Sequence, residues 1–309
     1  MEKRRFIITL AASVALLAIC MSAHPEVGHA AGSDMASYWA PVQKAMGVNG
    51  TIYEDGTLGF DVPRAIDVVL DGVKLAHGSD LSHEVHMMKT GNASMIMGEV
   101  VVTENEVGAT TQKLIAAGLN VTAIHNHMLR ETPHLLYIHY EGHGDPVAMA
   151  EKVRAIFDSL EGGVASADDT SGMAAVNCLD TATLDQIMRW QGKADDGVYS
   201  YSIPRKDNVT MNGMTISPHM DISQEVAFQP LGAGKAGLVV ELTLKTSEVE
   251  PVIKAFTENG IEVTALHNHM LTEQPRLFYL HCWATGDAET LARGTREALD
   301  HVNTVTGSR

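Results

Sequence analysis

Short apolar segments, separated by glycine and aspartate, alternate with longer amphipathic ones along the first half of the chain. The short segments predict β-strands at residues 57–62, 66–71, 84–89, 94–102, 120–129 and 135–143. The longer ones predict helices near residues 36–46, from a capping-box pattern at Thr103 and Glu106 to Gly118, and from Asp145 and Pro146 onward. Strands and helices therefore alternate, and Pro133 marks the turn between the last two strands.

The second half of the chain repeats this order. It predicts a helix at 181–189, a helix after Thr246 and Ser247 that ends at Gly260, strands at 262–271 and 277–284, and a last helix capped by Asp287. Residues 121–129 (VTAIHNHML) recur as residues 263–271 (VTALHNHML), 142 positions later. Between 121–145 and 263–287, 15 of 25 positions are identical. The chain therefore contains two copies of one module.

Strands that form hairpins, with helices between them, indicate an α+β fold. We expect two tandem homologous modules, each a largely antiparallel sheet with packed helices. The expected boundaries are a signal peptide at 1–30, module 1 at 31–160, a linker at 161–176 and module 2 at 177–309. The linker is placed where glycine, alanine, serine and aspartate dominate.

The N-terminus has the pattern of a secretory signal peptide. Three basic residues, Lys3, Arg4 and Arg5, precede an apolar run that ends at Cys20 and is short for a membrane span. Two processing outcomes are open. Cleavage near Ala30 would release the protein, whereas acylation of Cys20 would leave a lipoprotein, although Ile19 departs from the small residue that lipoboxes favour. Both outcomes place the mature protein in the periplasm or cell envelope.

Composition narrows the classes of partner. The chain has 309 residues, 38 acidic against 22 basic side chains, a net charge of −16 and 15 histidines. With 45% hydrophobic and 19% charged residues it does not have the composition of a disordered protein. The acidic balance argues against nucleic acid as a partner. We expect a metal ion or small molecule as partner, and a membrane only through a lipid at Cys20.

The doubled module, the repeated His-Asn-His-Met motif and residues 260–266 (GIEVTAL) carry a resemblance. The chain resembles the LppY/LpqO family of bacterial exported proteins and lipoproteins over nearly all of its mature length. That resemblance implies export and a tandem fold, but no activity, because the family is a domain of unknown function. In module 1, His83 and His86 replace a more apolar stretch.

Histidines form the main candidate site. His125 and His127 are two apart in a predicted strand, so their side chains share one face. If the turn is residues 131–133, His125 pairs directly with His139, whereas a register shift of one residue would move His139 to the other face. Module 2 repeats the set as His267, His269 and His281.

Three neutral imidazoles suit Zn(II) or Cu and leave one coordination position for water or substrate. We therefore expect a three-histidine metal site in each module. Glu84 and Glu225, and likewise Asp80 and Asp221, occur at matching positions and are candidates for a general base or a further ligand. The metal-free alternative is that Asn126 and the histidines bond to the backbone in a polar hairpin.

A second cluster contains His83, His86 and the nearby methionines Met87, Met88, Met95 and Met97. His83 and His86 are secondary metal candidates, because histidine with thioether ligands suits copper, but methionine is also a common core residue. Cys178 and Cys282 could form one disulfide in an oxidising compartment, and the sequence does not decide whether they do.

Three functions remain open from the sequence. The leading hypothesis is an exported metal-binding protein that handles or senses metal in the cell envelope. The alternatives are a zinc-dependent hydrolase that uses the same histidines, with Glu84 or Glu225 as base, and a metal-free envelope scaffold or binding module.

Overall fold

The computed structural model describes residues 28–165 and 176–306. Residues 1–27, with most of the expected signal peptide and Cys20, lie outside this range, as do residues 166–175 of the expected linker. The first described element, α1 (Gly28–Met46), begins within the last residues assigned to the signal peptide. Across the described ranges, no helix combines the length and the apolar character that a membrane crossing needs.

Module 1 is built on a six-stranded sheet with the order β1-β2-β5-β6-β8-β7, in which all neighbours are antiparallel. Its strands are β1 (Thr51–Ile52), β2 (Leu58–Pro63), β5 (Ser82–Thr90), β6 (Ala93–Thr103), β7 (Asn120–His125) and β8 (Leu135–Gly144). A separate two-stranded hairpin consists of β3 (Val69–Leu70) and β4 (Val73–Lys74). The helices are α1, α2 (Val107–Ala116) and α3 (Pro146–Phe157).

Module 2 repeats this arrangement with a six-stranded antiparallel sheet in the order β15-β16-β14-β13-β10-β9. Its strands are β9 (Lys193–Asp195), β10 (Val198–Pro204), β13 (Ser223–Gly232), β14 (Lys235–Lys245), β15 (Glu262–His267) and β16 (Leu277–Asp287). β11 (Thr210–Met211) and β12 (Met214–Thr215) form the matching hairpin. The helical elements are the 3-10 turn η3 (Val176–Cys178), α4 (Thr181–Met188), α5 (Thr246–Glu258) and α6 (Ala288–Leu299). The expected α+β fold is confirmed.

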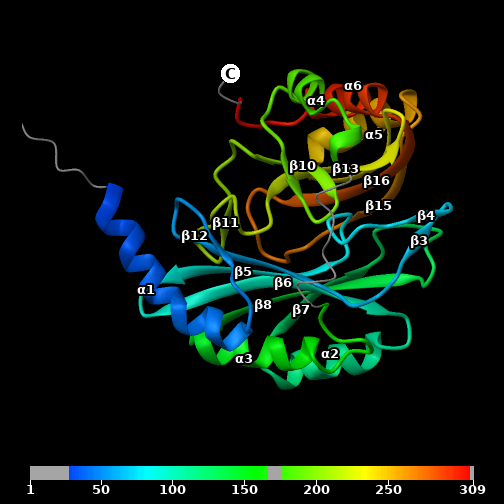
Figure 1. The fold of residues 1–309 in the computed structure, drawn as a ribbon. Coiled ribbons are helices and arrows are strands. Elements are labelled where there is room, and N and C mark those ends of the chain that lie inside the picture. The colour runs from blue at the N-terminus through cyan, green and yellow to red at the C-terminus, as the bar shows by residue number, and fades with distance from the viewer. Residues whose placement is uncertain (1–27, 166–175, 307–309) are drawn as a thin grey trace, which may run out of the picture.

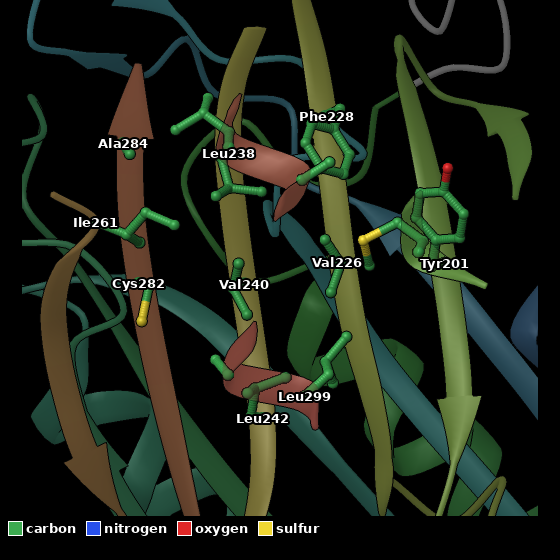
Figure 2. Packing of buried hydrophobic residues seen from close by; sticks show 14 of the residues in the cluster. Tyr201, Val226, Phe228, Leu238, Val240, Leu242, Ile261, Cys282, Ala284 and Leu299 are labelled. Atoms are coloured by element: carbon green, nitrogen blue, oxygen red, sulfur yellow. The ribbon is translucent and has the colours of Figure 1, made fainter. Parts of the chain in front are cut away.

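The helices of each module cover one face of its own sheet, and the other faces of the two sheets meet. In Figure 1, α2, α3 and the C-terminal half of α1 lie below the sheet of module 1, whereas α4, α5 and α6 lie above that of module 2. Each module has its own apolar core between sheet and helices. Figure 2 shows the core of module 2, where Val226, Phe228, Val240 and Cys282 project from neighbouring strands on the face of the sheet that also contacts Leu299. The candidate site lies between these two facing sheets.

Most predicted elements are present, and the differences concern the lengths of three strands. Asp145 and Asp287 cap α3 and α6 as predicted, each accepting a hydrogen bond from the backbone N–H three residues on. The predicted strand at 66–71 is reduced to two residues of a separate hairpin. The strands predicted at 120–129 and 262–271 end at His125 and His267, because the histidine motif leaves the sheet at that point.

Two apolar clusters join the modules on either side of the site. In one, the hairpin region of module 1 packs against Val239 and Trp283 of module 2. In the other, Met95 and Met97 of β6 pack with apolar residues of module 2, including Met211, Met220 and Met270. The candidate copper-binding methionines at 95 and 97 are therefore part of an apolar interface.

His83 does not join the candidate site. It lies three residues before His86 in β5, so the two side chains point to opposite faces of the sheet. The His83 ring is fully buried on the helical side and stacks on Phe157, with 4.3 Å between ring centroids. Its Nδ1 accepts a hydrogen bond from the Val101 N–H at 3.0 Å. His83 therefore lies apart from the histidine cluster and holds backbone in the core through Nδ1, and its role as a secondary metal candidate stays a prediction.

The two cysteines within the described ranges, Cys178 and Cys282, are both free, so no disulfide joins them. Cys178 is exposed, whereas Cys282 is fully buried in the core of module 2, where burial raises the pKa of its thiol.

Replacement of His83 tests its structural role. In module 2 the matching residue, Gln224, makes the same bond through Oε1 to the Thr243 N–H at 3.0 Å. We expect His83→Gln to unfold at a urea concentration near that of the wild type at pH 7. His83→Leu should lose a further ~1–3 kcal/mol, because it leaves the Val101 N–H buried and unpaired. Equal stabilities of the two variants would contradict this role.

The wild type and His83→Gln should also differ in how their stability depends on acid pH. Burial and the nearby Arg64 lower the pKa of His83 from 6.5 to about 3. The unfolded chain therefore takes up a proton at His83 between those pH values, while the folded chain does not, and the wild type loses stability as pH falls through that window. His83→Gln should lose less stability over the same window, as urea unfolding at a series of pH values would measure.

Candidate metal centre between the two modules

The six histidines predicted as ligands meet between the two sheets. His125 and His267 end β7 and β15, His127 and His269 follow in the loops, and His139 and His281 lie in β8 and β16. Ring pairs across the modules are close. Ring centroids lie 3.4 Å apart for His125 with His267, 3.7 Å for His127 with His281, and 3.6 Å for His139 with His269. The two predicted triads thus form one cluster rather than two separate sites.

The register of the hairpin differs from the expected one. His125 pairs with Tyr137, and His139 pairs with Ala123, with a bulge between Val121 and Ala123. The direct pairing of His125 with His139 is therefore wrong by two residues. Because two residues is one full period of a strand, His139 stays on the same face. Ligand nitrogens of His125, His127 and His139 still lie within 4.8 Å of one another.

One group of ligands, which we name composite site A, combines both modules. It contains Asp80 and His127 from module 1 with Glu241 and His281 from module 2, all with ligand atoms within 4.8 Å of one another. Asp80 Oδ2 lies 2.5 Å from His127 Nδ1 and 3.6 Å from His281 Nδ1. Glu241 Oε2 lies 3.2 Å from His281 Nε2. Two imidazoles and two carboxylates are a complete tetrahedral donor set for Zn(II).

Composite site B is the counterpart of site A with the modules exchanged. Its group of ligand atoms within 4.8 Å of one another comes from Asp221 and His269 of module 2 and His139 of module 1, and Glu99 of module 1 joins it through a contact with His139. Asp221 Oδ2 lies 2.6 Å from His269 Nδ1 and 3.9 Å from His139 Nδ1. Glu99 Oε2 lies 3.2 Å from His139 Nε2. The matching distances in the two sites show that the duplication extends to the geometry of the ligands.

Glu99 and Glu241 were not among the sequence-based candidates. Each lies directly opposite a site histidine on the neighbouring strand, Glu99 opposite His139 and Glu241 opposite His281. Both carboxyl groups are buried within otherwise apolar strands. A glutamate at the same position of an apolar strand in both copies was the available indication, because a buried carboxyl needs a partner.

Asp80 and Asp221 have an unusual backbone conformation. Their φ angles are +69° and +57°, in the left-handed region that few residues other than glycine and asparagine or aspartate adopt. Each lies just before the strand that follows the hairpin region of its module. Both copies keep this conformation, which presents the aspartate side chain to the histidines of both modules.

Burial sets the protonation states of the cluster. It lowers the pKa of His125 to about 4 and of His267 to about 2, and burial with neighbouring histidines lowers those of the other four imidazoles well below their ordinary value. Burial raises the pKa of Asp80 to about 7, and burial with nearby carboxylates raises that of Glu99 and Glu241 well above the ordinary range. Neutral imidazoles are the form that binds metal, and a bound cation would favour the ionised carboxylates.

Several buried ring nitrogens have no hydrogen-bond partner in the described parts of the chain. They include Nε2 of His125, His267 and His269, whereas Nε2 of His139 and His281 and both nitrogens of His127 face carboxylate oxygens at 2.5–3.6 Å without a well-aligned hydrogen bond. His125 Nδ1 lies 3.1 Å from the Asn126 carbonyl oxygen, to which it can donate, so that its Nε2 carries a free lone pair. Unpaired lone pairs that converge in a buried space are what metal ligation requires.

The asparagine of each His-Asn-His motif links the modules. Asn126 Nδ2 donates to the Thr264 carbonyl of module 2 at 3.3 Å and to the Met128 carbonyl of its own loop at 2.9 Å. Asn268 Nδ2 donates in turn to the Thr122 and Met270 carbonyls at 3.2 and 3.1 Å. Asn126 does bond to backbone, as the metal-free alternative expected, but it does so across the interface and thereby fixes both histidine loops.

A cavity of about 210 Å³ opens beside the composite sites. Asp80, Asp221 and Glu241 of those sites line it. The candidate bases Glu84 and Glu225 line it as well, together with His86, Lys193 and several serines. Glu225 is an exposed residue that accepts a hydrogen bond from the Ser202 hydroxyl at 2.6 Å, and desolvation by the surrounding protein together with the charge of Glu84 raises its pKa. The two sequence-predicted glutamates thus lie near the histidine cluster, but on the cavity side.

A family model described as "Domain of Unknown Function (DUF1259)" matches residues 40–159 and again residues 182–301. Each match falls within one of the two modules. No curated protein matches the chain. The resemblance to the LppY/LpqO family stays a prediction.

Solved structures with some likeness are shell proteins of bacterial microcompartments. The trimeric shell protein PduB has 13% identity and a TM-score of 0.21, with 84% of this chain and 96% of that chain covered. EtuB from Clostridium kluyveri has 11% identity and a TM-score of 0.18, with coverages of 79% and 86%. The fused permuted hexameric shell protein of the RMM microcompartment has 13% identity and a TM-score of 0.17, with coverages of 79% and 94%. At scores this low, the shell proteins inform neither the fold nor the function of this chain.

The asparagine links can be tested by substitution. Asn126→Ala and Asn268→Ala should each lower the free energy of unfolding by about 1–3 kcal/mol, because each removes two partly buried hydrogen bonds at ~0.5–1.5 kcal/mol apiece. Exposed Asn92 is the matched control, and Asn92→Ala should change little. Urea unfolding of the three variants would measure this. A cost no larger than that of Asn92→Ala would show that the asparagines do not hold the modules together.

Proposed function

The chain belongs to the DUF1259 family, and we propose that it is an exported cell-envelope protein that binds Zn(II) or Cu between its two modules. The observation that carries this proposal is the convergence of six histidines and four carboxyl side chains, from both modules, in one layer between the sheets, where six of the ten are buried and four are half-buried. Many of their nitrogens lack hydrogen-bond partners among the described residues. Burial of so many polar groups without compensation is costly, and a bound cation would compensate it.

The chemical types of the ligands limit which metal ion the sites would bind. Imidazole with carboxylate suits Zn(II) or Cu(II), whereas Cu(I) prefers sulfur ligands. Neither composite site contains a cysteine or a methionine. Zinc is therefore the metal we would test first. Export rests on the N-terminal sequence pattern, and a role in metal handling or sensing follows from a binding site in an exported protein.

The experiment is metal analysis of the full-length protein purified from its native compartment, and after zinc loading. We expect at least one zinc for each composite site. The double variant His127→Gln with His269→Gln removes one ligand from each site and should weaken zinc binding at least about tenfold, as titration calorimetry would measure.

The control is His143→Gln with His301→Gln, one exposed histidine in each module. It should bind zinc like the wild type. The proposal would be refuted if the wild type is purified without metal and then takes up neither zinc nor copper on loading. That result would favour the metal-free scaffold. Equal binding by the two double variants would refute the assigned ligands.

The cavity favours a second candidate, the zinc-dependent hydrolase. A hydrolase needs an open space beside the metal and a carboxyl group that can exchange a proton near neutral pH, and the cavity with Glu225 offers both. Glu225 would hold and transfer the proton, while the metal would polarise the bond to be cleaved.

This candidate predicts that the zinc-loaded protein hydrolyses a simple activated ester or phosphate, such as p-nitrophenyl acetate or p-nitrophenyl phosphate. Glu225→Gln should lower that rate by about 10²–10⁴-fold without loss of zinc. Glu289→Gln, at an exposed position, should have no effect. A zinc-loaded wild type that is no faster than free zinc on either compound would rule out this chemistry for these substrates and leave metal binding as the function.

A further inference from the structure

Composite site B adjoins a third group of ligands on the cavity side. Glu84 and His86 of β5 lie on the face that meets module 2, and Asp221 of module 2 approaches them there. Glu84 Oε2 is 3.1 Å from His86 Nε2, and ligand atoms of Glu84, His86 and Asp221 all lie within 4.8 Å of one another. Asp221 thus belongs to two groups, this one and the group with His139 and His269.

We propose that Glu84, His86 and Asp221 bind a metal ion of their own, which faces the cavity and shares Asp221 with composite site B. This inference rests on the proposed function, since it requires that composite site B itself holds a metal. A carboxylate has two oxygens, so one aspartate can serve two neighbouring ions, as in other two-metal centres. The shared aspartate would make site B and the third site one binuclear centre.

The surroundings of the third site favour a cation. Asp61, Asp80, Glu225 and Glu241 also line the cavity, which contains one lysine, Lys193. The third site therefore lies in a strongly acidic part of the cavity, where a bound cation would offset the negative charge.

Composite site B also supplies the second observation that points to a ligand. His139 and His269 are almost completely buried, at 2% relative exposure each, and Nε2 of His269 has no hydrogen-bond partner in the described ranges. Asp221 Oδ2 lies 2.6 Å from His269 Nδ1 and 3.9 Å from His139 Nδ1, and the same aspartate has a ligand atom within 4.8 Å of those of Glu84 and His86.

The third site exists in only one half of the molecule. The matching residues in the other half are Glu225, Ala227 and Asp80, and all three line the same cavity. Alanine replaces His86 there, so composite site A has no such neighbour. This asymmetry supplies two matched variants. His86→Ala introduces the residue that module 2 has, and Ala227→His introduces the residue that module 1 has.

The test is zinc stoichiometry of the full-length protein, by metal analysis after loading and gel filtration. We expect three zinc ions in the wild type, two in His86→Ala and up to four in Ala227→His. The chelator 4-(2-pyridylazo)resorcinol should remove one zinc of the wild type faster than the other two, because the third site is open to the cavity. His86→Ala should lack this fast phase. Circular dichroism and thermal unfolding would verify that both variants are folded.

The outcomes separate the two proposals. Two zinc ions in both wild type and His86→Ala, with the same chelation kinetics, would overturn the third site and leave the composite sites intact. A wild type that takes up no zinc or copper would overturn both. Loss of all zinc in folded His86→Ala would show that His86 belongs to the buried centre, and would also overturn a separate third site.

Discussion

The two modules are held together around buried groups that neither module can satisfy alone. Asp80 meets His127 of its own module, but the other neighbour within reach, His281, belongs to module 2. Asp221 likewise contacts His269 of its own module and lies within reach of His139 of module 1. A buried carboxyl or imidazole without a partner costs several kcal/mol in order of magnitude. The close approach of the sheets, the clusters on either side and the asparagine links all serve this polar layer.

The arrangement also explains why the modules need not be joined by large apolar sheet faces. Apolar clusters flank the histidines, one with Val239 and Trp283 and the other rich in methionine. They exclude water from the layer between them and thereby strengthen every electrostatic interaction there. The cavity is the opening on one side of this layer, and it brings solvent and small molecules to the carboxylates of the composite sites.

Much of this could be predicted from the sequence, and the part that could not has a physical reason. The repeat, the α+β class, most elements and the six site histidines follow from local patterns and from comparison of the two halves. Glu99 and Glu241 were missed because a single carboxyl in an apolar strand has no periodic pattern. The sharing of ligands was missed because the contact between two sheets is set by packing between modules, which no local period encodes. His83 and His86 look equivalent in the sequence, yet strand alternation separates them.

A dimer of two identical chains must repeat every substitution in both of its halves, so a symmetric site can only change symmetrically. The tandem chain is free of that restriction. His86 occurs opposite Ala227, and Arg130 joins Glu262 and Asp71 where the other half has only a Thr272–Asn212 hydrogen bond. Covalent linkage thus lets one half keep the ancestral geometry while its twin diverges, and the two nearly equal centres can evolve distinct roles within one molecule.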